Sequence, residues 1–179
     1  EGGLEPSGVG SGDNMFMYTT PSLMDGLTVK ASFLPSRAGK DSALGFSGTY
    51  TGVEGLTVSV AQGDSNSVGN TEDASVLKAS YAWGPITIAY SDYEYDAAAT
   101  TNDDEVTSIK LSYTVSDELS VSYGTEDIDQ GTKSSEYERI SVSYTTGGMT
   151  ISASMSEATD MDGTTTATVL AEALIKEVN

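Results

Sequence analysis

Short segments in which apolar and small polar residues alternate strictly recur along the chain, and the connections between them differ in length. Short connections lie at residues 20–26, 51–55, 84–85, 116–118 and 145–148. Long polar runs lie at residues 63–74, 92–105, 124–136 and 157–165. Successive side chains of a strand point to opposite faces, so each segment reads as a strand with one apolar face. In an up-and-down meander every second connection falls on the same side, so we predict tight turns on one side and long loops on the other.

The alternation predicts ten strands and leaves the tail open. The strands are expected at residues 15–19, 27–33, 44–50, 56–60, 77–83, 86–91, 109–115, 119–123, 139–144 and 149–155. Residues 164–168 read as strand, whereas residues 167–178 are rich in Ala, Leu, Glu and Lys, which favour helix. An eleventh strand and a short helix are therefore both possible readings of the tail.

The sorting of the connections favours one kind of sheet. Short turns on one side and long loops on the other are typical of a transmembrane β-barrel, whose strands carry only half of their residues to the lipid. A run of about 18 apolar residues, which a transmembrane helix needs, does not occur. We predict an all-β, antiparallel, up-and-down transmembrane β-barrel with a loop or linker at residues 1–14 and the barrel domain at residues 15–179. The Gly-rich opening residues suggest that this barrel is incomplete at its N-terminal side.

Aromatic residues on the apolar faces fall into two sets. One set lies near the short connections and comprises Tyr18, Tyr50, Tyr81, Trp83, Tyr113 and Tyr144. The other lies near the long runs and comprises Phe33, Tyr90 and Tyr123. Amphipathic rings collect at the two membrane–water boundaries, so the sets predict the aromatic girdles of a membrane barrel. The alternative is a soluble sheet in which tyrosines pack across strands.

Four basic residues, Lys30, Lys78, Lys110 and Arg139, occupy the small-polar faces of their segments. In a barrel that face lines the lumen, where water solvates the charge. A Lys or Arg on the lipid face near the midplane costs about 2–4 kcal/mol. We therefore predict that these four side chains line a pore, although an ordinary solvent-facing sheet would also hold lysines.

The residue content excludes several kinds of chemistry. The chain has no His and no Cys, which removes imidazole bases, thiol nucleophiles, disulfides and the usual zinc sites. Its 27 acidic and 8 basic residues give a net charge of −19, which repels nucleic acid. Residues 127–138 faintly resemble a calcium loop but carry Thr132 where that loop requires Gly. We expect no enzyme, no cofactor, no metal site and no nucleic-acid partner.

Several connections, with their flanking residues, resemble the turn motifs of general diffusion porins from the outer membranes of proteobacteria. The run Tyr81-Ala82-Trp83-Gly84-Pro85 shows the pattern best, with an aromatic strand end before Gly-Pro. Related motifs lie at residues 18–22, 25–29, 51–58, 111–121 and 144–150. The resemblance implies a trimer of barrels with about sixteen strands each, of which this chain supplies the C-terminal ten or eleven. The chain departs from that family at its end, where Val178 and Asn179 stand instead of a terminal aromatic residue.

The resemblance implies an outer-membrane porin of a Gram-negative bacterium, a water-filled channel for passive diffusion of small hydrophilic solutes and ions. Its expected partners are outer-membrane lipid, lipopolysaccharide, further copies in a homotrimer and the remaining N-terminal strands of the same barrel. Acidic loops would concentrate cations at the entrance, whereas the basic lining would oppose them. The alternative is a soluble or cell-surface β-sandwich with an adhesive or structural role, which would need no detergent for solubility.

Overall fold

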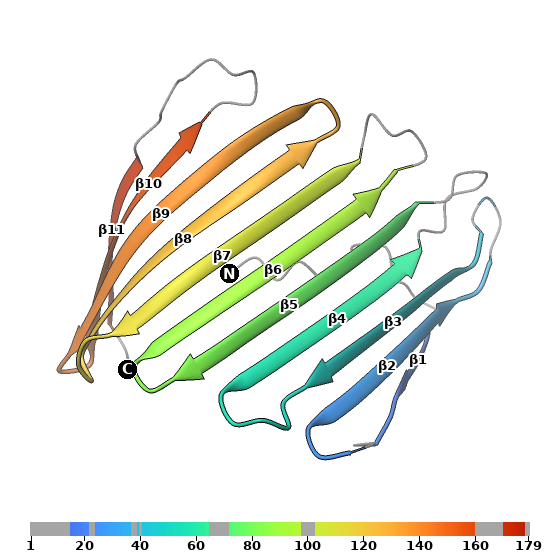
Figure 1. Cartoon of the computed structure of the whole chain (residues 1–179), viewed down its shortest axis with the longest axis horizontal. Coiled ribbons are helices and arrows are strands. Elements are labelled where there is room, and N and C mark those ends of the chain that lie inside the picture. The colour runs from blue at the N-terminus through green and yellow to red at the C-terminus, as the bar shows by residue number, and fades with distance from the viewer. Residues whose placement is uncertain are drawn as a thin grey trace.

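A single antiparallel sheet makes up the described part of the chain. The computed structural model describes residues 15–21, 24–36, 39, 41–64, 72–97, 103–159 and 170–177. Each strand pairs with its neighbours in the sequence, in the order β1 to β11 (Figure 1). The strands are β1 (Phe16–Thr19), β2 (Leu27–Leu34), β3 (Ala43–Tyr50), β4 (Leu56–Asp64), β5 (Asp73–Trp83), β6 (Ile86–Asp96), β7 (Asp104–Thr114), β8 (Leu119–Gln130), β9 (Lys133–Thr146), β10 (Met149–Thr159) and β11 (Leu170–Glu177). The predicted meander is confirmed, and the tail is a strand at residues 170–177.

The sheet is strongly curved. Strand β1 at one end, and β10 and β11 at the other, bend behind the central strands (Figure 1). Within the described backbone, β1 and β11 pair with β2 and β10 but not with each other, so the sheet is an open trough. The described part of the chain contains no helix that is long and apolar enough to cross a membrane.

The connections predicted as short lie together at one edge of the sheet. Gly84 and Pro85 join β5 to β6, and Gly147 and Gly148 join β9 to β10. Gly55 has a φ of 77°, a conformation that glycine adopts without a steric cost. Gly55 lies beside Ala82, near the short-turn end of the adjacent strand β5, and the Ala82 N–H donates to the Gly55 carbonyl at 2.8 Å. A Cβ on Gly55 would overlap the Ala82 carbonyl oxygen, so the turns are closely fitted to one another.

The predicted long loops are shorter than expected, because strands extend into all four of these runs. Residues 124–136 form a hairpin in which β8 ends at Gln130, β9 begins at Lys133, and only Gly131 and Thr132 stand between them. At this connection the predicted sorting of short and long loops therefore fails. The acidic residues of these runs lie largely on strand ends. Backbone pairing needs only N–H and C=O groups, so the ladder continues beyond the point where the apolar pattern stops.

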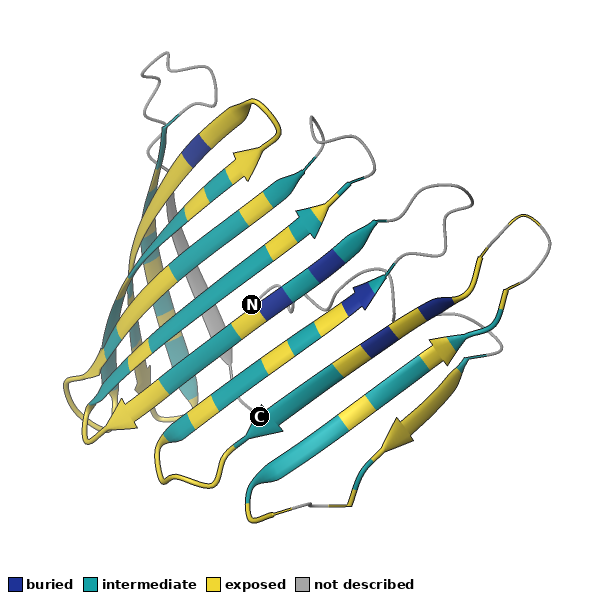
Figure 2. Ribbon diagram, turned by 45° about the vertical axis from the view of Figure 1, so that its right-hand side comes forward, coloured by how far each residue is buried: buried dark blue, intermediate teal, exposed yellow. Residues whose placement is uncertain are grey.

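The sheet has very little core, because no second layer packs on it in the described residues. The buried side chains of the described residues are Ala43, Ala74, Val76 and Ser135. They lie on β3, β5 and β9, far from the short turns (Figure 2). Large apolar side chains are instead exposed, and Trp83 is 70% exposed. An apolar surface of this extent marks contact with a membrane or with another protein.

Candidate functional site

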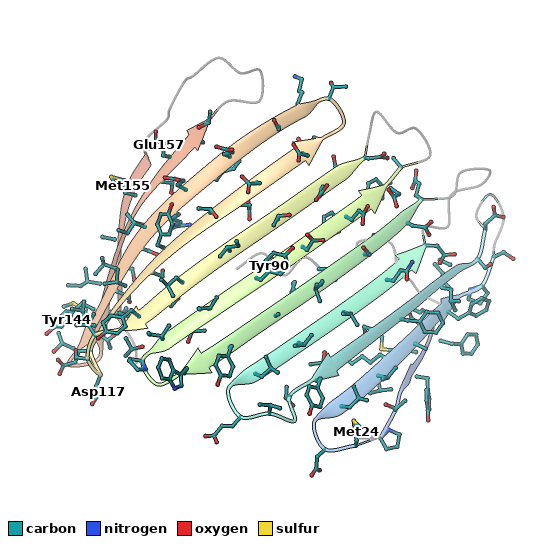
Figure 3. All side chains as sticks on the ribbon, viewed as in Figure 1. Met24, Tyr90, Asp117, Tyr144, Met155 and Glu157 are labelled. Carbon is teal, nitrogen blue, oxygen red and sulfur yellow. The ribbon has the colours of Figure 1, made fainter. Side chains whose placement is uncertain are left out.

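The cross-strand register separates two faces along the whole sheet. Tyr90 lies on the face turned toward the viewer in Figure 3, which is the convex face because both ends of the sheet bend away. Tyr90 pairs with Ala79 and Ile109, so these residues share the convex face. Following the pairing from strand to strand places every larger apolar residue of the predicted apolar faces on this side. The small polar residues of the same segments lie on the concave side.

The four predicted pore-lining residues all lie on the concave face, within the wall rather than at its short-turn edge. Lys30 is three residues from the end of its strand at the short turns, Lys78 five, Lys110 four and Arg139 seven. Each residue advances a strand by about 3.3 Å, so the four charges occupy the middle of the wall rather than its edges. Lys30, Lys110 and Arg139 are exposed, and Lys78 is half-buried.

Two of these cations occupy one hydrogen-bonded row. Lys110 pairs with Gly124, and Gly124 pairs with Arg139, so two strand spacings, or about 10 Å, separate the two basic residues. The Arg139 guanidinium donates to Ser154 Oγ at 2.9 Å, which holds it toward β10. Gly124 adds no side chain between the two cations.

The rows closer to the short turns carry hydroxyl groups. Ser122 Oγ and Ser141 Oγ lie 2.8 Å apart, and Thr145 Oγ1 and Thr150 Oγ1 lie 2.9 Å apart. Each pair bridges neighbouring strands on the concave face. A hydroxyl both donates and accepts, so these rows can bind water or either kind of ion weakly without a charge of their own.

Sequence reasoning missed the acidic residues of the concave face. Glu126 lies two residues along β8 from Gly124 of the Lys110–Arg139 row and accepts a hydrogen bond from Ser108 Oγ at 3.0 Å. Asp104 pairs with Tyr95 near the opposite end of the wall. Both residues lie in polar runs, whose composition predicts loops. Their inward direction could have been found only by extending the alternation of β7 and β8 beyond the apolar segments.

The predicted girdle residues all lie on the convex face, although three of them lie at an unexpected level. Tyr90 and Tyr123 were expected near the long connections, but each is the fifth residue from the short-turn end of its strand, β6 or β8, and so lies within the wall rather than at its far edge. Figure 3 shows Tyr144 close to Asp117 at the edge of the short turns. The remaining residues of that set follow the same edge, except that Tyr18 pairs with Ala31 in the middle of β2. The prediction that Tyr18 lies near the short-turn edge is therefore wrong. Strand β1 has only four residues and ends at Thr19, which pairs with Lys30, three residues inside the short-turn end of β2.

Carboxylates begin directly beyond the second aromatic set on the convex face. The Tyr90 hydroxyl donates to Asp92 at 2.9 Å, and the Tyr123 hydroxyl donates to Glu138 at 3.1 Å. Both rings thus point their polar ends away from the short turns. We call the convex carboxylates the acidic belt; it comprises Asp64, Asp73, Asp92, Glu94, Asp96, Glu105, Asp127, Asp129, Glu136, Glu138 and Glu157. On β2 to β10, the convex face between this belt and the short turns carries no charged side chain.

The described residues contain no group of three or more His, Cys, Asp or Glu side chains placed to hold a metal ion. Asp127 and Glu138, the ends of the run that faintly resembles a calcium loop, lie on β8 and β9 of a hairpin. Both face the convex side, where each belongs to the acidic belt.

The fold is that of known outer-membrane proteins. The chain resembles the anion-selective porin from Comamonas acidovorans with a TM-score of 0.62 and 15% identity, over 93% of this chain and 55% of that chain. It resembles in-vitro folded OmpT, an outer membrane protein of Vibrio cholerae, with a TM-score of 0.57 and 17% identity, over 92% and 60% of the two chains. The trimer form of the Vibrio cholerae protein matches with a TM-score of 0.57 and 16% identity, over the same shares of the two chains. The chain thus spans 55–60% of the length of these proteins.

Comparison of the sequence with protein-family models assigns the chain to a family. A search of curated protein sequences finds no significant match. A family model described as Gram-negative porin matches residues 2–145, about four fifths of the chain. Porins are channels rather than enzymes, and their place is the outer membrane. The chain therefore belongs to the Gram-negative porins and is an outer-membrane β-barrel protein of a Gram-negative bacterium.

Proposed function

We propose that this chain forms more than half of the wall of a water-filled pore through which small hydrophilic solutes and ions diffuse passively. The observation that carries the proposal is the placement of charge at mid-depth. Lys30, Lys78, Lys110 and Arg139 lie on the concave face there, while the convex face at the same depth is apolar. Water must solvate the first set and lipid must cover the second. No chemical reaction is part of the proposal.

A closed pore requires strands beyond the eleven described. The free edges of β1 and β11 would leave backbone groups unpaired in hydrocarbon, which costs several kcal/mol per group, roughly the cost of an unmade hydrogen bond in an apolar medium. We propose that further strands of the same polypeptide pair with both edges. A trimer is also proposed, in keeping with the trimer form of the Vibrio cholerae protein.

The convex face is proposed to sit in the membrane between the aromatic residues of the short-turn edge and the acidic belt. Tyr81, Trp83, Tyr113 and Tyr144 mark the short-turn boundary. Tyr90 and Tyr123 lie only four residues, or about 13 Å, from the short-turn ends of their strands and so lie within the span. Strand β5, whose 11 residues run from Asp73 to Trp83, carries its first convex carboxylate at Asp73. A tilted strand of about 9–11 residues spans the hydrocarbon core. The acidic belt would then lie at the level of the lipid and lipopolysaccharide head groups.

The position of the carboxylates alters the expected ion preference. Loop anions at the entrance would favour cations, but the acidic belt faces away from the lumen. On β2 to β10, the concave face at mid-depth instead combines the four cations with Glu126 alone. Charges in a narrow lumen are screened less than charges in open water. We therefore propose a preference for anions, and the Comamonas acidovorans porin of similar fold is itself anion-selective.

The test is the reversal potential across a salt gradient for the assembled pore in a planar bilayer. The native pore should favour chloride over potassium. Replacing Lys78→Gln, Lys110→Gln and Arg139→Gln together should move the reversal potential toward cation preference, because three charges leave the wall. Replacing Glu118→Gln, in a short turn outside the lumen, is the matched control and should leave it unchanged. An unchanged reversal potential in the triple variant would show that these residues do not line the conducting path.

A further inference from the structure

The polarity of the two faces is exchanged along β5 to β8. On β6, the convex residues change from Ile88 and Tyr90 to Asp92 and Glu94, while the concave face reaches Tyr93. The concave face thus becomes apolar where the convex face becomes acidic. Directly paired residues form a continuous row there, which we call the apolar row: Val76, Tyr93, Val106 and Ile128. A water-filled porin lumen is ordinarily polar, so this row needs its own explanation.

Part of the apolar row is accessible. Val76 is 8% exposed, whereas Tyr93, Val106 and Ile128 are half-buried. On β9 the residue paired with Ile128 is the buried Ser135, and Tyr137, one row closer to the short turns on the same face, is 37% exposed. It is the most exposed aromatic residue on the concave face of the described strands. The side of the row toward β9 therefore presents an apolar and aromatic surface to the lumen.

Positive charge lies next to this surface. Arg139 follows Tyr137 by two residues on the same face of β9, about 7 Å along the strand. Its guanidinium uses one N–H on Ser154 and has others to offer to a solute. Lys110 lies in the row of Arg139 and follows Val106 by four residues on β7. A carboxylate and an apolar group could thus be bound together.

Glu126 determines the direction in which such a solute would bind. It pairs with Tyr137 and is held by Ser108 at 3.0 Å, so its charge lies between the apolar row and the row of cations. A carboxylate at the level of Tyr137 would be repelled by Glu126. A carboxylate one step closer to the short turns would meet Arg139, which can form charge-assisted hydrogen bonds with it.

We propose that the concave wall binds organic monocarboxylates whose body is aromatic or branched aliphatic. The body lies against Tyr137 and the apolar row, and the carboxylate points toward Arg139 and Lys110. The inference rests on the proposed pore and specifies which anions it favours. It also accounts for an apolar row two same-face rows from the Lys110–Arg139 row, in a wall whose rows near the short turns carry hydroxyl groups.

The test uses the whole porin polypeptide in planar bilayers, with benzoate and acetate as probes. Both carry one negative charge, but only benzoate carries an aromatic body. Benzoate should reduce the chloride conductance at concentrations at which acetate does not. Loss of one aromatic or apolar contact is worth about three- to tenfold in affinity, so Tyr137→Ser and Val106→Ser should each raise the half-blocking benzoate concentration by about that factor.

Three further variants complete the test, of which Arg139→Gln probes the site and the other two are controls. Tyr137→Phe keeps the ring and should block like the native pore, whereas Arg139→Gln should weaken the block by benzoate. Tyr90→Ser, on the convex face of the strand that carries Tyr93, should leave the block unchanged. The native mobility shift between unboiled and boiled samples in SDS shows which variants are folded.

Two results would overturn the inference. One is equal conductance in benzoate and acetate for the native pore, which is expected if another protein segment covers the apolar row. The other is an unchanged half-blocking concentration in folded Tyr137→Ser and Val106→Ser. Failure of the pore itself looks different, because regular chloride conductance steps would then be missing before any carboxylate is added.

Discussion

The wall of the sheet has two halves in which the apolar residues lie on opposite faces. We call the part from the short turns to the level of Lys110 the turn half, and the part beyond it the outer half. On β8, the turn half puts Val121 and Tyr123 on the convex face, while the outer half puts Asp127 there and Ile128 on the concave face. The same ladder of backbone hydrogen bonds runs through both halves. On the proposed membrane placement, the acidic belt of the outer half marks the outer edge of the lipid, and the polarity of the two faces changes there.

The two halves show that the alternation of apolar and polar residues along a strand has a phase as well as a period, where the phase is the face that carries the apolar residues. A period of two establishes that a segment is extended. Which phase is apolar depends on what lies against each face. On the proposed placement, lipid lies outside and water inside in the turn half. In the outer half the convex face is acidic and faces head groups and water, so apolar residues such as Val106 on the concave face require a partner of another kind.

The largest loss of stability is expected when a charged side chain is placed on the convex face. Leu111→Arg, in the turn half, should cost about 2–4 kcal/mol, whereas Thr107→Arg on the same face of β7 should cost about 0–1 kcal/mol because water is near. Denaturant titration of the refolded porin in lipid vesicles measures both. Equal losses would mean that the boundary between the halves is not the edge of the hydrocarbon.

A smaller loss of stability is expected from alanine substitutions at two glycines of the short-turn edge, and its size should differ between them. Gly147→Ala should cost about 1 kcal/mol, because a left-handed φ of 56° disfavours a side chain but nothing lies within 4 Å of the added Cβ. Gly55→Ala must also displace the Ala82 carbonyl, so we expect about 2–3 kcal/mol. The same titration compares them. A cost for Gly55→Ala no larger than that for Gly147→Ala would show that the turns at this edge are not closely fitted.

Thiol labelling should separate the two halves without altering stability. The chain has no native Cys, so single replacements report one site each. A membrane-impermeant reagent should label Lys110→Cys at least about tenfold faster than Leu111→Cys, because lipid covers the latter. In the outer half, Glu126→Cys and Asp127→Cys should label at similar rates, since water reaches both faces. Faster labelling of Leu111→Cys than of Lys110→Cys would reverse the assignment of the faces.

The smallest expected change in stability is a gain on removing charge repulsion within the acidic belt. Glu105 lies directly between Glu94 and Asp129 on the convex face. Like charges opposite one another destabilise a sheet, so Glu105→Gln should stabilise the folded porin by about 0.5 kcal/mol at low salt. The gain should disappear at high salt, where the charges are screened. A gain that persists at high salt would point to a cause other than charge, and Glu118→Gln is the control.

The turn half could be read from the sequence almost entirely. Its strands, tight turns and faces follow from alternation in a region where lipid and water lie on opposite sides, so the pattern alone assigns Lys78 and Lys110 to one face. The outer half could not be read in this way. Runs such as residues 124–136 carry acidic residues on one face and mixed residues on the other, and polarity of this kind indicates a loop. Glu126, Tyr137 and the apolar row were missed for that reason.

The sequence by itself determined that the chain is a meander of antiparallel strands with an apolar face and a basic face, because a period of two and short Gly-containing turns leave few alternatives. Only the tertiary structure decided the rest. The register brings Lys110 into one row with Arg139, and Tyr137 opposite Glu126, because pairing across strands depends on where each turn closes rather than on the pattern within a strand. The curvature of the sheet then turns the basic face inward, and the length of β8 and β9 carries the wall beyond the apolar band.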